Sequence, residues 1–325
     1  MNTAIKLGGF GIGLAAVFTA ALGLGSLFPA AAPATPAAHD GGHNSTPPEQ
    51  KAAPAAVLPA GLQISQDGYR LIPLTGSLST GTPEPFRFRI TGPDDRPVTA
   101  YTTSHDKDLH LIVVRRDLSG FQHVHPELGS DGTWSIPLAV PAAGQYRVFA
   151  DFQPAGHDGL TLGADVPAPG DYQPTLLPAT ARTATVDGYT VTLAGDLIPG
   201  ASSKLTLSVS RDGKPVTDLQ PYLGAYGHLV ALRDGDLAYL HVHPDGEPGD
   251  GRTTPGPDVA FHAEVPSAGA YRLYLDFQHE GKVRTAEFTA VAVAATATPS
   301  SAPAPTEMPG APSPFGHDAD GHTHD

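Results

Sequence analysis

The chain has 325 residues, no cysteine and methionine only at Met1 and Met308, which excludes disulfides and metal sites built from thiolate or thioether ligands. Acidic side chains outnumber basic ones by 33 to 19 and no basic run occurs, which argues against nucleic-acid binding. Any metal ion must therefore take nitrogen or oxygen ligands, and the 15 histidines offer many of the former.

An uncharged apolar run from Leu7 to Phe28 follows Lys6 and is long enough to cross a bilayer as a helix. We predict that residues 1–32 form an uncleaved signal anchor, and the positive-inside rule then places the rest of the chain outside the cytoplasm. A cleaved signal peptide is the alternative, because small residues follow Pro29. The predicted location is the extracellular side of the cell membrane, or the medium if the segment is cleaved.

Two further segments lack any apolar periodicity. Residues 33–61 are rich in Ala and Pro and are predicted to form a disordered stalk. Residues 294–325 have a similar composition but end in a His- and Asp-rich stretch. We expect a mobile tail whose tip binds divalent metal weakly, through His317, His322 and His324.

The part of the chain between these segments is a duplication. Three histidines of the first half each have a counterpart 118 positions later: His110 corresponds to His228, His123 to His241 and His125 to His243. Residues 140–153 recur with an offset of 125 as residues 265–278, so a loop between the two motifs differs in length. We predict one repeat at 62–168, a linker at 169–182 and a second repeat at 183–293.

Both repeats consist of short runs in which apolar and polar residues alternate, separated by turn signals such as Ser130-Asp131-Gly132. This pattern is typical of an all-β sandwich, and neither repeat shows a helical period. We predict two tandem immunoglobulin-like β-sandwich domains after the N-terminal membrane helix. The aromatic residues of the 140–153 and 265–278 segments are expected in the cores: Tyr146, Phe152, Tyr271 and Phe277.

In the second repeat, Asp234-Gly235 predicts a two-residue hairpin turn that would place His228 directly opposite His241. His243 would lie two residues along, on the same face of the strand. The equal spacing in the first repeat, around Arg116-Asp117, predicts the same arrangement there. The predicted triads are His110, His123 and His125, and His228, His241 and His243.

Three neutral imidazoles with an open coordination position suit Zn²⁺ or Cu²⁺, so we predict one ion in each repeat. Asp151 or Asp276 could supply a fourth ligand, because each interrupts an otherwise apolar strand. Four histidines have no counterpart at matching spacing and are expected at the surface, or as auxiliary ligands at most: His105, His157, His262 and His279.

Two other interpretations remain open at this point. The histidines could be structural, or could sense pH in a non-catalytic interaction module at the cell surface. A three-histidine site could also activate water, but no general acid or base is placed beside the triads, and no catalytic motif occurs. We therefore predict that the protein is not an enzyme.

The segment from Gly227 to Pro244, with Ala268 to Gln278, resembles exported or membrane-anchored actinobacterial proteins described as heavy-metal-binding. More loosely, the Ala-Gly-x-Tyr strand is similar to immunoglobulin-like copper-resistance sandwiches of the CopC and YtkA type. The resemblance implies export and the handling of copper or another heavy metal, together with an unidentified metal transporter or chaperone as partner. The chain lacks methionine-rich motifs, which argues against Cu(I).

Overall fold

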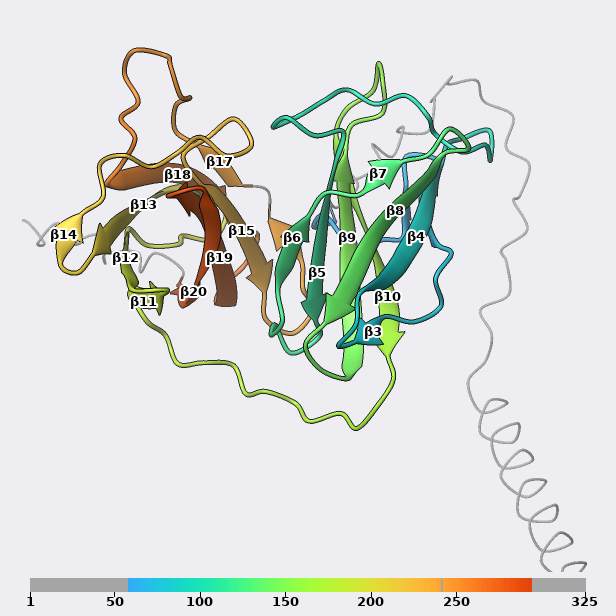
Figure 1. Ribbon diagram of the computed structural model, residues 1–325, viewed down its shortest axis with the longest axis horizontal. Coiled ribbons are helices and arrows are strands. Elements are labelled where there is room, and N and C mark those ends of the chain that lie inside the picture. The colour runs from blue at the N-terminus through green and yellow to red at the C-terminus, as the bar shows by residue number, and fades with distance from the viewer. Residues whose placement is uncertain (1–57, 241, 294–325) are drawn as a thin grey trace, which may run out of the picture. The chain divides into compact units, whose positions relative to one another are not determined.

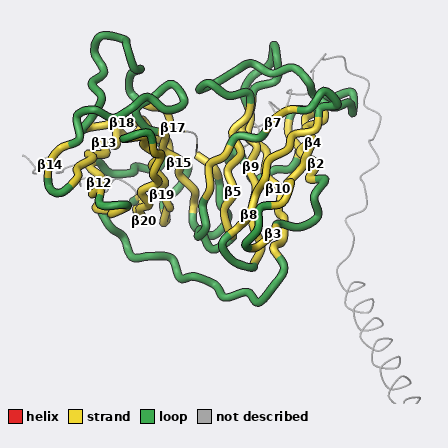
Figure 2. Tube along the Cα trace, in the orientation of Figure 1, coloured by secondary structure: helices red, strands yellow, loops and turns green. Residues whose placement is uncertain are grey.

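The computed structural model describes residues 58–240 and 242–293, and every regular element in these ranges is a β-strand (Figure 2). No helix in these two ranges is long and apolar enough to cross a bilayer. The predicted anchor, most of the predicted stalk, His241 and the predicted tail with its three histidines lie outside the described residues.

The first repeat contains two sheets (Figure 1). The larger sheet is formed by β1 (Ser65–Gln66), β2 (Tyr69–Pro73), β3 (Ser79–Thr80), β4 (Glu84–Thr91), β7 (Glu127–Leu128) and β8 (Thr133–Val140). The smaller sheet has the order β10-β9-β5-β6, with β5 (Leu109–Arg115), β6 (Gln122–Val124), β9 (Gly144–Phe152) and β10 (Leu160–Ala168).

The second repeat is built in the same way. Its larger sheet contains β11 (Thr183–Val186), β12 (Tyr189–Ala194), β13 (Ser202–Arg211), β14 (Lys214–Pro215), β17 (Val242–Pro244) and β18 (Asp258–Glu264). Its smaller sheet has the order β16-β15-β19-β20, with β15 (His228–Arg233), β16 (Tyr239–Leu240), β19 (Gly269–His279) and β20 (Lys282–Ala292).

Each repeat has its own apolar core, to which both of its sheets contribute side chains. The predicted core aromatics Tyr146, Phe152, Tyr271 and Phe277 are all buried, as expected. Within residues 58–240 and 242–293, the prediction of an all-β fold with two repeated sandwich domains is thus confirmed.

The outer faces of the two smaller sheets form a third apolar cluster, which joins the repeats. Strand β5 is buried along its whole length, because Leu111 and Val113 face its own core while Ile112 and Val114 face the other repeat. An unbroken apolar run of this kind is expected of a strand covered on both faces.

Equivalent positions of the two repeats meet in this interface. Residues 112, 114, 121 and 149 of the first repeat correspond to 230, 232, 239 and 274 of the second, and all belong to the cluster or pack against it. The ring of Phe121 stacks on Tyr274 with centroids 3.9 Å apart, and the equivalent rings of Tyr239 and Phe149 lie 5.5 Å apart. The repeats therefore dock with an approximate two-fold relation, as in an isologous dimer.

The segment before β1 bonds to both repeats. The backbone N–H of Tyr239 donates to the carbonyl of Ala60 at 3.0 Å, and the N–H of Gly61 donates to Thr161 at 2.9 Å. The guanidinium of Arg147 donates to the carbonyl of Gly61 from two nitrogens, at 3.0 and 2.6 Å. Residues near Ala60 therefore tie the second repeat to the first.

The predicted hairpin register is wrong by two residues. His123 pairs with Ile112, and Leu240 pairs with Ala231, so the connections contain more than a two-residue turn. In both connections a leucine takes a left-handed conformation, Leu118 at φ 65° and Leu237 at φ 60°. Because side chains alternate along a strand with a period of two, this error leaves His110 and His123 on the predicted common face.

Candidate metal centre

The three histidines of the first repeat converge on the face that meets the second repeat. One nitrogen from each of His110, His123 and His125 lies within 4.8 Å of the others. Nδ1 of His110 is 3.0 Å from Nε2 of His123 and 3.2 Å from Nε2 of His125. Nitrogens bound at about 2.0–2.1 Å to one tetrahedral ion lie about 3.3 Å apart, so the spacing suits a metal ion.

The hydrogen-bond partners on the outer side of two of these rings determine which ring nitrogen carries the proton. Nε2 of His110 lies 3.1 Å from the carbonyl oxygen of Ser104, which can only accept, so the N–H of the neutral ring is at Nε2. Nδ1 of His123 lies 2.8 Å from Oδ2 of Asp276 and donates to that carboxylate. The lone pairs on Nδ1 of His110 and Nε2 of His123 therefore face each other at 3.0 Å, which only an intervening cation makes favourable.

The second repeat fixes its first histidine in the same way. Nε2 of His228 lies 2.9 Å from the carbonyl of Tyr222 and 3.0 Å from that of Leu223. Tyr222 is the counterpart of Ser104, since 104 and 222 differ by the same 118 positions. His228 therefore also holds its proton at Nε2 and leaves Nδ1 available to an ion.

His228, the first member of the second predicted triad, lies beside the first triad. The ring of His228 lies 6.2 Å from that of His123, and the ring of His105 lies 6.0 Å from His110 and 5.3 Å from His228. Five described imidazoles from both repeats thus form one connected cluster. His105, expected to be peripheral, is the member that the sequence spacing missed.

Each predicted aspartate faces a histidine across its sheet. Asp151 pairs with His110 and Asp276 pairs with His228 in the strand register. Asp276 accepts a hydrogen bond from Thr285 through Oδ1 and reaches His123 of the other repeat through Oδ2. Asp276 therefore orients a histidine, which differs from the direct coordination that we predicted for it.

Burial keeps three of the rings neutral. It is the main cause that lowers the pKa of His110 to about 4, of His125 to about 3 and of His228 to about 4, and neighbouring imidazoles lower these values further. At neutral pH these rings therefore present unprotonated nitrogens, the form that binds metal. The His123 and Asp276 side chains are only 5% and 4% exposed, so solvent barely screens their contact.

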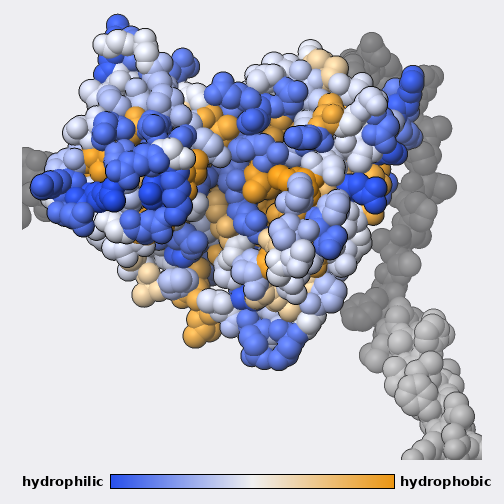
Figure 3. Space-filling view, in the orientation of Figure 1, coloured by the Kyte–Doolittle hydropathy of each residue, from blue (hydrophilic) through white to orange (hydrophobic). Residues whose placement is uncertain are grey.

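Two hollows are lined by members of the cluster, and a third shares the lining residue Asp151 with one of them. Asp151, Tyr239, His243 and His262 are among the residues that line one of about 830 Å³, between the repeats. Two smaller hollows, of about 200 and 420 Å³, share His105 as a lining residue. On the face drawn in Figure 3, hydrophilic residues cover most of the surface and apolar residues form smaller patches.

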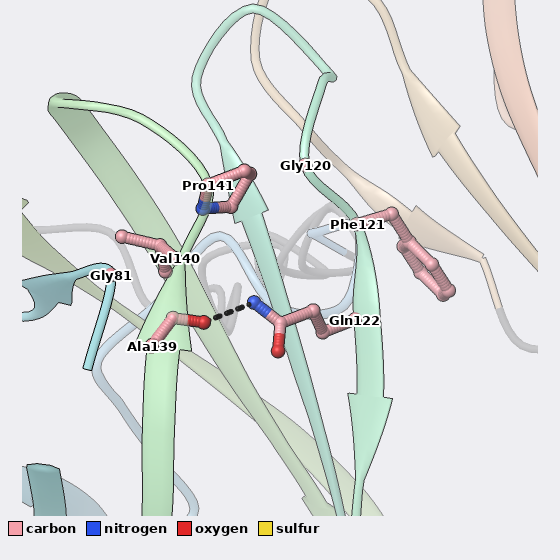
Figure 4. Close-up of a pocket in the computed structure, with 7 residues that line it drawn as sticks. All are labelled: Gly81, Gly120, Phe121, Gln122, Ala139, Val140 and Pro141. Atoms are coloured by element: carbon pink, nitrogen blue, oxygen red, sulfur yellow. Dashed lines mark hydrogen bonds between the residues drawn. The ribbon is translucent and has the colours of Figure 1, made fainter. Parts of the chain in front are cut away.

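Another hollow, of about 370 Å³, lies between the end of β8 and the start of β6 (Figure 4). The amide of Gln122 donates to the carbonyl of Ala139 across it at 2.9 Å. Its lining residues carry no titratable side chain, so it is not the candidate site.

The other described histidines take different positions. His243 is exposed on β17, where it pairs with His262 of β18, also exposed. His157 is exposed, as expected. His279 is 8% exposed and bonds to the hydroxyl of Tyr189 at 2.7 Å, so its predicted surface position is wrong. It ends a long strand of the second core, where a polar partner compensates its burial.

Comparison with known families adds one assignment. A family model described as "Domain of unknown function (DUF8832)" matches residues 64–173 and 184–294. The chain belongs to this DUF8832 family. The two DUF8832 domains coincide with the two sandwiches, and the segment around Ala60 that joins them lies before the first domain.

Solved structures similar to the DUF8832 pair are distant. They include a Salmonella alpha-2-macroglobulin mutant (15% identity, TM-score 0.22, covering 73% of this chain and 15% of that one). An Escherichia coli alpha-2-macroglobulin is a further example (15% identity, TM-score 0.23, covering 70% of this chain and 20% of that one). Another is the bacterial integrin-binding protein invasin (14% identity, TM-score 0.20, covering 68% of this chain and 39% of that one). The chain thus spans less than two thirds of the length of these relatives.

No curated protein matches the sequence. None of the comparisons supports the predicted resemblance to a heavy-metal-binding family, so the case for metal binding depends on the geometry of the histidines.

Proposed function

We propose that the protein binds a divalent transition-metal ion, Zn²⁺ or Cu²⁺, through His110, His123 and His125. The observation that carries this proposal is the pair of lone pairs that face each other at 3.0 Å, each fixed by a hydrogen bond on the far side of its ring. Outer partners that fix the tautomers of ligands are a regular feature of metal sites.

The wider setting is also part of the proposal. We place the two sandwiches, which we take to be immunoglobulin-like, outside the cytoplasm, where the segment from Leu7 to Phe28 would tether them. The role is binding, for metal handling or resistance, and we assign no reaction. The net charge of −14 favours the approach of cations.

A second candidate function follows from the buried contact between His123 and Asp276. A proton can be the cation between the lone pairs, since a doubly protonated His123 would donate to both Asp276 and His110. The cluster would then be a structural or pH-sensing element of a cell-surface module.

Metal titration separates the two functions. We would use the full chain with all histidines outside residues 58–293 replaced by alanine, so that stalk and tail do not bind. At pH 7.5, calorimetry and thermal shift with Zn²⁺ and Cu²⁺ should show binding that His123→Ala abolishes. His157→Ala, an exposed histidine of the same repeat, is the matched control and should bind like the parent.

Absence of binding by the parent would reject the metal proposal. A pH-dependent thermal shift that Asp276→Asn removes would then support the pH-sensing function.

A further inference from the structure

The loop before β5 and its counterpart before β15 form the same tight turn. In the first repeat the N–H groups of Ser104 and Lys107 each donate to the carbonyl of the other residue, at 2.9 and 3.1 Å. His105 and Asp106 between them have φ of 49° and 61°. Residues other than glycine rarely adopt such φ angles, and residues held in this conformation are often found at functional sites.

The turn of the second repeat closes between Tyr222 and Ala225, with bonds of 2.8 and 3.2 Å. Its central residues are Leu223 and Gly224, with φ of 53° and 73°. The backbone is therefore the same in both repeats, whereas the first central residue is histidine in one and leucine in the other. An imidazole at this place is not needed to form the turn.

A second difference between the repeats lies close to the first. The loop that follows Pro244 is seven residues longer than the loop that follows Pro126, as the offsets of 125 and 118 show. Gly246, Glu247 and Asp250 of the longer loop line the hollow of about 420 Å³, together with His105 and His243. The added segment of the second repeat thus faces the added histidine of the first.

His105 also lines the hollow of about 200 Å³, together with His110 and Asp151. This inner hollow reaches the buried triad, while the outer one carries exposed His243 and Glu247. The ring of His105 therefore stands between an outer set of nitrogen and oxygen groups and the inner ligand His110.

We propose that His105 passes the metal ion between the outer hollow and the His110–His123–His125 cluster. This inference rests on the proposed metal binding and adds the route by which the ion arrives and leaves. The outer hollow would collect the cation through His243 and the carboxylate of Glu247. Asp250 contributes negative charge. The backbone N–H groups of Glu247, Arg252 and Thr253 donate to its oxygens, which stabilises the ionised carboxylate.

The handover requires a ligand that can exchange, and a neutral imidazole presents one unprotonated nitrogen at a time. Nδ1 of His105 lies 3.2 Å from Oγ of Ser104. Leu223, at the equivalent place in the second repeat, has a side chain without any atom that binds a metal ion. The proposed route therefore exists at only one of the two equivalent turns.

Kinetics of Zn²⁺ exchange test this role. The variant His105→Leu places in the first turn the residue that the second turn already accommodates, so the fold should be kept. In the background without stalk and tail histidines, stopped-flow mixing with Zn²⁺, and then with a chelator, gives the rates of uptake and release. We expect both rates to fall at least tenfold, roughly the effect of one supporting group near a metal site, with stoichiometry and affinity retained.

Asp106→Gly is the matched control, since it makes the turn more like that of the second repeat but keeps the imidazole, and its rates should stay near those of the parent. His105→Asn, with a residue that tolerates positive φ, serves if the leucine variant does not fold. Unchanged rates in the variants of His105 would overturn the proposal. A loss of affinity with unchanged uptake would make His105 an equilibrium ligand and overturn it as well. A parent that binds no Zn²⁺ would instead reject the proposed function.

Discussion

The two repeats place equivalent aspartates at equivalent points of equivalent strands, and each carboxylate contacts the other repeat. Thr285 bonds to Asp276 and Thr161 bonds to Asp151, at 2.6 and 3.0 Å. Oδ2 of Asp276 reaches Nδ1 of His123 at 2.8 Å, and Oδ2 of Asp151 lies 3.5 Å from the hydroxyl of Tyr239, so each of these contacts crosses to the other repeat. The histidine cluster therefore belongs to the docked pair, since neither repeat alone contains all its supporting groups.

The largest effect should come from the interface that creates the pair. Tyr274 is fully buried, stacks on Phe121 and donates to the carbonyl of Leu118 at 2.6 Å. We expect Tyr274→Ala to lower the free energy of unfolding by about 3–5 kcal/mol, and Phe149→Ala at the equivalent position to do the same. Urea denaturation measures both, with Val291→Ala at an exposed site as control. Losses below about 1 kcal/mol would mean that the repeats do not depend on this contact.

Each neutral ring should contribute a pH effect of up to about 3 kcal/mol, because burial lowers its pKa from 6.5 to about 4. The folded chain holds the pKa of His110 and His228 at about 4, below their ordinary 6.5, so the unfolded chain takes up these protons at higher pH. Stability should therefore be complete above pH 6.5 and decline as pH falls from 6.5 toward 4.

Urea midpoints at pH 7 and pH 5, with a chelator present, test this decline. His110→Asn and His228→Asn should each reduce the loss of stability between pH 7 and pH 5. The sizes of the two reductions compare the contributions of the two repeats. Equal midpoints at the two pH values in the parent would contradict the burial of neutral imidazoles.

The comparison of the two aspartates extends to metal affinity. Asp276→Asn replaces the acceptor for Nδ1 of His123 by a weaker one, and removal of such support weakens metal binding by about 10–100-fold. Asp151→Asn is the equivalent change in the first repeat. Calorimetric titration with Zn²⁺ measures both affinities, and an unchanged affinity in Asp276→Asn would contradict the supporting role of this carboxylate.

The smallest expected effect concerns the segment that ties the repeats. Gly61 has φ +71°, and a Cβ there would lie 2.5 Å from a ring carbon of Phe149. Gly200 has φ +72° with no atom within 4 Å, so alanine there suffers the same backbone strain without the clash. We expect Gly61→Ala to cost about 1–2 kcal/mol more than Gly200→Ala in urea denaturation. Equal costs would mean that the segment does not hold the repeats together.

The strands and the first triad could be predicted from local patterns. Alternation placed Tyr146 and Phe277 in the cores, and His110 stayed on the same face as His123 although the register was wrong by two residues. The length of the connection could not be predicted, because Leu118 takes a left-handed conformation that its sequence does not suggest.

The docking of the repeats was also missed, since it depends on packing between distant segments. One signal was present: the run Leu109 to Val114 is apolar except for His110, without the alternation of a strand with one exposed face. Such a run indicates burial on both faces, and therefore a partner for the outer one. The contact of His123 with Asp276, separated by 153 positions, had no local sign.

The two-fold docking has a further consequence because one chain carries both halves. In a homodimer every substitution occurs twice, so a change that helps one side of the axis is imposed on the other as well. Covalent linkage removes this constraint, and it also raises the effective concentration of each half near the other. A histidine at position 105 and a longer loop after Pro244 could thus arise once each, on opposite halves. An approximately symmetric pair of domains then has one side through which the ion enters and leaves.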